Sequence, residues 1–141
     1  MRNFWRRLSS LLALCTGSAA LFACPAYGSP GVGSAAIASF SYTPPSPVHF
    51  SDTLTFQADV TDAEIKLVRV RIDGVVHHWV DLNDAGQAPD TQASDGVWTG
   101  ALYWKAKMGA DEQMSVAAYA YRDPASVATG RREGPPLTVL P

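Results

Sequence analysis

Strict alternation of apolar and polar side chains over residues 51–60 constrains the fold of this chain more than any other feature. The apolar residues are Leu54, Phe56, Ala58 and Val60, and the polar residues between them are Thr53, Thr55, Gln57 and Asp59. A period of two places successive side chains on opposite faces of an extended chain. The pattern therefore predicts a half-buried antiparallel strand with Phe56 in the core and Thr55 outside it.

Six further segments have the length and composition of short strands. They span residues 36–42, 66–72, 75–82, 97–104, 113–122 and 137–140. Glycine, proline and aspartate separate them, and the proline-rich residues 44–47 exclude a helix and suit a corner after an edge strand. No segment shows a sustained helical period. We therefore predict one all-β domain over residues 36–141, an immunoglobulin-like two-sheet antiparallel sandwich of about seven strands.

The dipeptide Asp73-Gly74 lies between two of these segments and predicts a two-residue hairpin turn. Such a turn would pair Val70 with His77, which places His77 and Trp79 on the core face and His78 in solvent. Adjacent strand residues point to opposite faces, so the two histidines are not expected to converge on one metal ion or substrate.

The N-terminal residues have the pattern of a secretory signal. Arg2, Arg6 and Arg7 precede an uncharged run over residues 8–23, and this order of charge and hydrophobicity is typical of an export leader. The run is shorter than the ~20 apolar residues that a membrane-spanning helix needs. We expect an exported protein, either periplasmic or secreted.

Two cleavage routes are open for this leader. Small residues at Ala26 and Gly28 predict a signal peptide over residues 1–28, followed by a flexible tether over 29–35. The alternative is the run Leu21-Phe22-Ala23-Cys24, which resembles a lipobox. In that case the leader would end at residue 23, and a lipid on Cys24 would be the one predicted membrane attachment.

Removal of the leader makes the remaining chain acidic. The leader contains three of the eleven basic residues and none of the thirteen acidic ones, so the chain from Ser29 onward has a formal charge of −5. This charge argues against a nucleic-acid partner, because nucleic-acid binding requires clustered lysine and arginine. Both cysteines, Cys15 and Cys24, lie in or beside the leader, so we expect a folded body without a disulfide.

Residues 84–99 combine three carboxylates with two glycines and run directly into an aromatic strand. The matching positions are Gly86, Asp90, Asp95, Gly96, Trp98 and Thr99, while Ala85 and Ser94 stand where aspartate and glycine are frequent. Their spacing resembles the aspartate-glycine loop of bacterial immunoglobulin-like and fibronectin-III-like sandwich domains. The resemblance implies this fold and an exported accessory domain. It implies no single function, because such sandwiches have many unrelated functions.

Two roles are open for Asp84, Asp90 and Asp95. Calcium prefers six to eight oxygen ligands, and these carboxylates would supply part of such a shell. Aspartate and glycine are also the residues that form tight turns, in which the carboxylate accepts hydrogen bonds from nearby backbone N–H groups. We favour the turn role, with no cofactor, and keep a calcium site as the alternative.

Aromatic residues indicate a candidate binding surface. The alternation over residues 114–121 places Tyr119 and Tyr121 on the outer face of a strand. Together with Tyr103 they would form a flat ledge for a sugar ring or a partner protein. The alternative is that the tyrosines only stabilise the sheet. Trp98 and Trp104 are expected in the core, and the loop over 130–136 is expected to expose Arg131 and Arg132 as solvated charges.

The sequence contains no known catalytic motif. A Gly-x-Ser-x-Gly elbow, a phosphate-binding loop, a dinucleotide-binding glycine pattern and a His-Glu-x-x-His motif are all missing from it. We therefore predict no enzymatic activity. The favoured function is a non-catalytic exported interaction module that binds a protein or surface partner in the cell envelope or outside the cell. The alternative is a carbohydrate-binding module, with a surface glycan as partner and a structural calcium site.

Overall fold

A computed structural model of the chain describes residues 36–141. The predicted signal peptide, Cys24 and the tether over 29–35 lie outside the described residues. The described part contains no α-helix, and none of its segments is a helix long and apolar enough to cross a membrane. Its eight strands are β1 (Ile37–Thr43), β2 (Thr53–Val60), β3 (Leu67–Asp73), β4 (His77–Leu82), β5 (Val97–Tyr103), β6 (Glu112–Tyr121), β7 (Gly130–Glu133) and β8 (Leu137–Val139).

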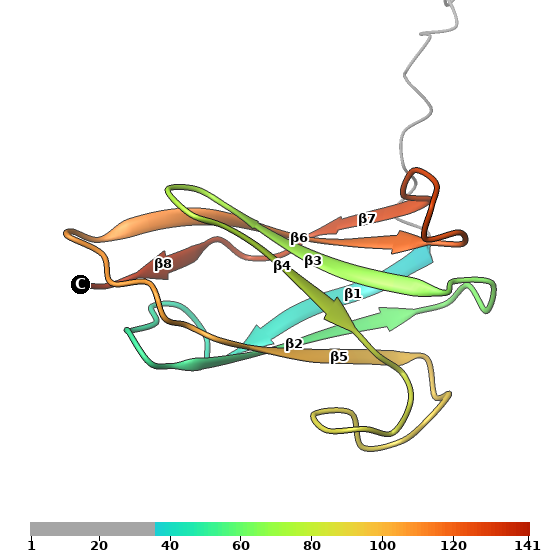
Figure 1. The fold of residues 1–141 in the computed structure, drawn as a ribbon. Coiled ribbons are helices and arrows are strands. Elements are labelled where there is room, and N and C mark those ends of the chain that lie inside the picture. The colour runs from blue at the N-terminus through green and yellow to red at the C-terminus, as the bar shows by residue number, and fades with distance from the viewer. Residues whose placement is uncertain (1–35) are drawn as a thin grey trace, which may run out of the picture.

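The strands form two antiparallel sheets that face each other as two layers (Figure 1). The three-stranded sheet has the order β1-β2-β5. The five-stranded sheet has the order β4-β3-β6-β7, and β8 also pairs with β6. The chain crosses between the sheets after β2, after β4 and after β5. The predicted all-β, two-sheet sandwich is confirmed, with one strand more than expected.

The hydrophobic core lies between the two sheets. Phe56 of β2 is fully buried, and its ring centroid lies 6.3 Å from that of Phe40 and 6.1 Å from that of Tyr42. Thr55 lies on the opposite face of β2 and is only half-buried. The division of β2 into a core face and an outer face is therefore confirmed. The facing sheet contributes these buried residues: Val68, Val70, Ile72, Met114, Val116, Ala118 and Ala120.

A β-bulge changes the alternation at the start of β1. The pairing with β2 shifts between Ile37, which is opposite Val60, and Ser39, which is opposite Asp59. One extra residue in a strand turns the following side chains to the other face. Ile37 is therefore buried and Ala38 exposed, and the core face of the strand continues with Phe40 and Tyr42.

The register of the β3–β4 hairpin differs from the prediction. Asp73 pairs with His77, so residues 74–76 form a three-residue connection instead of the expected two-residue turn. The pairing is shifted by an odd number of positions, and such a shift moves every side chain of β4 to the other face. His78 therefore faces the core, while His77 and Trp79 are exposed. The prediction that His77 and Trp79 are core residues is wrong, although the two histidines do point to opposite faces.

Gly74 does not have the role that the Asp73-Gly74 signal predicts. A two-residue turn of the expected type needs positive φ angles at both of its central residues, and Gly74 is not among the residues with positive φ. A Cβ atom on Gly74 would instead lie 2.7 Å from Cγ of Met114. The glycine permits the hairpin to approach β6 closely. In β4 of the same hairpin, the ring of His78 packs edge-on against the ring of Trp104, with the two ring centroids 5.2 Å apart.

The segment that was expected to be a loop at residues 130–136 begins with a strand. Residues Gly130–Glu133 form β7 and pair with residues 117–120 of β6. This strand contains no apolar side chain, so a test for hydrophobic alternation has nothing to detect in it. The expectation of a loop is therefore wrong at these residues, but Arg131 and Arg132 are exposed, as expected.

Candidate functional site

The three tyrosines of the predicted ledge lie on two different surfaces. Tyr103 is opposite Thr53 in β2, on the outer face of the three-stranded sheet, and it is exposed. Tyr119 and Tyr121 are half-buried on the outer face of β6, in the five-stranded sheet. The outer faces of the two sheets of a sandwich point in opposite directions. The structure therefore keeps Tyr119 near Tyr121 but does not bring Tyr103 to them.

The aromatic neighbour of Tyr119 is instead Trp79 of β4. Their ring centroids are 6.1 Å apart with a tilt of 52°, although β3 lies between the two strands. Trp79 is 51% exposed, and its ring also lies 5.8 Å from the guanidinium carbon of Arg69 and 5.3 Å from that of Arg71. Sequence reasoning missed Trp79 as a surface residue because the predicted register buried it.

A further arginine extends this surface onto β7. Nε of Arg131 donates a hydrogen bond to the Tyr119 hydroxyl at 3.2 Å, and the guanidinium carbon lies 5.7 Å from the Tyr119 ring. We refer to Arg69, Arg71, Trp79, Tyr119 and Arg131 as the arginine–aromatic face. It crosses four strands of one sheet, from β4 to β7.

Each arginine of this face is held by a carboxylate on its own or a neighbouring strand. Arg69 pairs with Asp81 at 2.5 Å, Arg71 with Asp73 at 2.6 Å and Arg131 with Glu133 at 2.6 Å. The hydrogen bond from Arg69 lowers the pKa of Asp81, and the bond from Arg131 to the Tyr119 hydroxyl contributes most to raising the pKa of that arginine. Each guanidinium group therefore has a favoured orientation in the free protein.

A small depression lies beside the arginine–aromatic face. It has a volume of about 270 Å³ and is lined by Arg71, Tyr119, Arg131 and Glu133, among others. Ala117 contributes to its floor, because this residue lies between Arg71 of β3 and Glu133 of β7. A methyl side chain among long neighbours leaves room for a polar group of a ligand.

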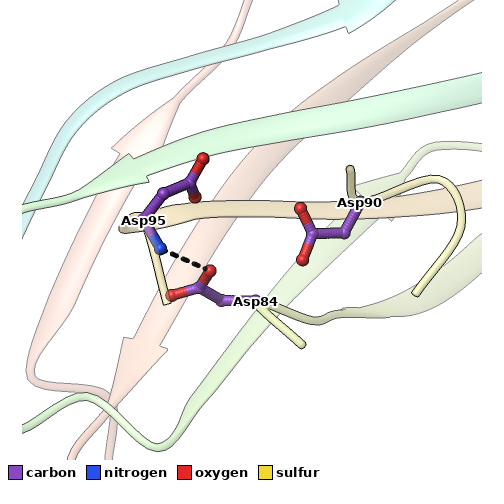
Figure 2. Close-up of side chains that lie close together, drawn as sticks. All are labelled: Asp84, Asp90 and Asp95. Atoms are coloured by element: carbon purple, nitrogen blue, oxygen red, sulfur yellow. Dashed lines mark hydrogen bonds between the residues drawn. The ribbon is translucent and has the colours of Figure 1, made fainter. Parts of the chain in front are cut away.

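The acidic loop between β4 and β5 forms a second cluster, and here the three predicted residues do come together. One carboxylate oxygen from each of Asp84, Asp90 and Asp95 lies within 4.8 Å of the other two (Figure 2). No lysine, arginine or histidine in residues 36–141 forms an ion pair with any of them. These residues are the ones that could hold a cation.

Backbone N–H groups donate hydrogen bonds to most of the carboxylate oxygens of these three aspartates. The two oxygens of Asp84 accept bonds from Asp95 at 3.1 Å (Figure 2) and from Gly96 at 3.2 Å. The buried Asp90 accepts bonds from the N–H groups of Gly86 at 2.6 Å and Gln92 at 3.3 Å. One oxygen of Asp95 accepts a bond from Val97 at 2.9 Å. Five of the six oxygens thus have a backbone donor.

The glycines of this loop have the backbone conformations that its turns require. Gly86 has a φ angle of 66° and Gly96 one of 83°, in the region where glycine is favoured. A Cβ atom on Gly96 would also lie 3.0 Å from the backbone oxygen of Val60. The spacing of aspartate and glycine is therefore explained by the hydrogen bonds and turns of the loop itself.

Comparison with known proteins adds no assignment to this geometry. No protein-family model matches the chain, and no curated protein matches it significantly. The fold and its surfaces define the chain as an all-β sandwich that has an arginine–aromatic face on one sheet and a hydrogen-bonded acidic loop at one end.

Proposed function

We propose that this chain is a non-catalytic, exported interaction module of the immunoglobulin-like or fibronectin-III-like type. It binds a protein or surface partner, in the cell envelope or outside the cell, through its arginine–aromatic face. The observation that carries the proposal is the exposed Trp79 ring, which lies against two arginines and next to Tyr119. Tryptophan, tyrosine and arginine are the residues most enriched among those that dominate binding energy at interfaces.

Pre-organisation supports the same conclusion. Ordering a long side chain at an interface costs about 0.5–1.5 kcal/mol. In this face Arg69, Arg71 and Arg131 are already held by carboxylates and rings, so part of that cost is met in the free protein. A partner with complementary carboxylate or aromatic groups therefore meets a surface that does not need to rearrange.

Site-specific photo-crosslinking tests the proposed surface. A photoreactive phenylalanine analogue in place of Trp79 should give a discrete adduct with envelope or culture components of the native host. The matched control is the same analogue in place of Tyr103, which is also exposed and also has a cation over its ring, at 5.7 Å from Nζ of Lys105. Equal adducts at both positions, or none at position 79, would contradict the assignment.

Export is tested separately, by the intact mass of the protein recovered from the envelope and the medium. We expect a chain that begins at Ser29, because Ala26 and Gly28 are the small residues that signal cleavage requires. A diacylglyceryl group on Cys24 would establish the lipoprotein alternative. A protein that keeps its first twenty residues would refute export.

A carbohydrate-binding module with a structural calcium site is the second candidate function. The depression over Ala117 favours it, because arginine and glutamate side chains lie beside the Tyr119 ring there, and such groups bond sugar hydroxyls while a ring face stacks on the sugar. Retardation in native gels that contain a soluble polysaccharide tests this function. Retardation that is lost in Tyr119→Ala and kept in Tyr103→Ala would favour a glycan over a protein partner.

A further inference from the structure

A cavity of about 690 Å³ lies at the end of the sandwich where the β2–β3 and β4–β5 loops meet. This volume is within the ~300–1,000 Å³ that is usual for small-molecule sites. Val60, Leu82 and Trp98 contribute apolar surface from both sheets, and the two loops contribute small, polar and charged residues. No residue of the arginine–aromatic face lines this cavity, so it is a separate site.

Trp98 is the aromatic residue of this cavity. It is opposite Ala58 on the inward face of β5, but it is only half-buried. All three exposed aromatic residues of the described chain, Phe50, Trp79 and Tyr103, have a lysine or arginine over the ring. Within residues 36–141 no such cation lies over Trp98. Tyr121 is also half-buried and also has no such cation among the described residues, but it does not line the cavity, so Trp98 is the ring that a cation in the cavity would contact.

The charges around the cavity favour a positive ligand. Three carboxylates line it, and Lys66 is the one lysine or arginine among the lining residues. Arg122 neutralises Asp62 at 2.8 Å from outside the cavity. Asp84 and Asp95 form no ion pair within the described chain, and one oxygen of Asp95 has no backbone donor there.

We infer that this cavity binds a small organic cation, with its ammonium group against the Trp98 ring and its charge compensated by Asp84 and Asp95. An aromatic face attracts a cation through its quadrupole, and the attraction is stronger where water is excluded. A bare metal ion would need six or more oxygen ligands instead and would have no use for an indole ring. The combination of ring, apolar wall and carboxylates therefore points to an ammonium group that has apolar substituents.

Titration with choline tests this inference, followed through the indole N–H resonance of Trp98 in the full mature chain. The matched ligand is dimethylbutanol, the neutral isostere in which carbon replaces the quaternary nitrogen. We expect a saturable shift with choline, and affinity for the isostere at least about tenfold weaker, because only the charged ligand gains both the cation–π attraction and the attraction of the two carboxylates. Equal affinity for both ligands would show an apolar cavity only and would overturn the inference. No saturable shift with choline would overturn it as well.

Three variants locate the site. Trp98→Leu should weaken choline binding about fivefold, the equivalent of the ~1 kcal/mol of a cation–π contact at a site that is open to water. Asp95→Asn should weaken it by up to about fivefold, and Lys66→Gln should strengthen it by a similar factor, because both residues are exposed. Asp95→Asn keeps a side-chain oxygen that accepts the hydrogen bond from the Val97 N–H group. We therefore expect this variant to fold, and it still tests the inference if Trp98→Leu does not fold. Unchanged affinity in both Asp95→Asn and Lys66→Gln would refute the role of charge in this cavity.

Discussion

Asp84 closes the β4–β5 loop, and its removal gives the sharpest test of how that loop is held. Its carboxylate accepts hydrogen bonds from the N–H groups of Asp95 and Gly96, and its backbone oxygen accepts one from the N–H group of Ser94 at 3.1 Å. Asp84→Ala removes the two carboxylate bonds. A hydrogen bond to a charged group contributes about 1.5–3 kcal/mol, but Asp95 is exposed and its freed N–H group can bond to water. We therefore expect a total loss of about 1–2 kcal/mol.

Thermal unfolding measures this loss. For a domain of this size about 1 kcal/mol corresponds to roughly 4 °C, so Asp84→Ala should melt about 4–8 °C below the wild type. The control is Asp111→Ala, since this exposed aspartate has no hydrogen bond or ion pair to any described residue. Equal melting of the two variants would refute the role given to the carboxylate of Asp84.

Thermal unfolding in chelator and then in millimolar calcium separates the two roles of Asp84, Asp90 and Asp95, which are turn formation and calcium binding. Five of the six carboxylate oxygens have backbone donors, so we expect calcium to shift the wild-type melting temperature by no more than about 2 °C. A bound ion at a hundredfold excess over its dissociation constant would contribute about 2.7 kcal/mol instead. A rise of that size that disappears in Asp90→Asn would contradict the turn role and establish a calcium site.

Three further predictions concern the stability of the sandwich. Phe56→Ala should cost about 3–5 kcal/mol in denaturant unfolding and Thr55→Ala less than about 1 kcal/mol, and equal midpoints would contradict the assignment of the two faces. Gly100→Ala should destabilise by about 1–3 kcal/mol, because its Cβ would lie 2.7 Å from Cδ2 of Leu82, and wild-type stability would refute this close contact. Arg69 lowers the pKa of Asp81, so the stability this pair provides is present above the ordinary pKa of ~3.9 and is lost as the pH falls through the lowered value. The free energy of unfolding of the wild type should therefore fall more steeply below about pH 4 than that of Asp81→Asn. Parallel curves of stability against pH for the two proteins would contradict a stabilising role of the Arg69–Asp81 pair.

The sequence predicts those parts of this fold in which one face of a strand is apolar. The alternation in β2 separates Phe56 from Thr55 correctly, and that in β6 separates Met114 and Val116 from Tyr119. In both strands the burial of one face determines which side chains share it. The strand β7 has no apolar face, so only its pairing with β6 identifies it as a strand.

The candidate sites follow the same rule. Asp84, Asp90 and Asp95 were recognisable because turn chemistry restricts the residue types of a tight loop. Trp79 was not, because its position on the surface depends on the length of the β3–β4 connection. The surroundings of that connection include Met114, which lies far from Gly74 in the sequence, so a local turn signal does not contain them.

The hairpin connection therefore determines the candidate binding surface as well as the core. With three residues in the connection, β4 buries Val80 and Leu82 and exposes Trp79. A two-residue turn would bury Trp79 in their place and move both aliphatic side chains into solvent, because an odd shift exchanges the two faces of a strand. The core would then have to accept the Trp79 indole and the Asp81 carboxylate where it now holds two aliphatic groups, and both close packing and the cost of burying a charge oppose this change. The packing that excludes the shorter turn is thus what places Trp79 beside Arg69, Arg71 and Tyr119, and the arginine–aromatic face is a consequence of how the core is filled.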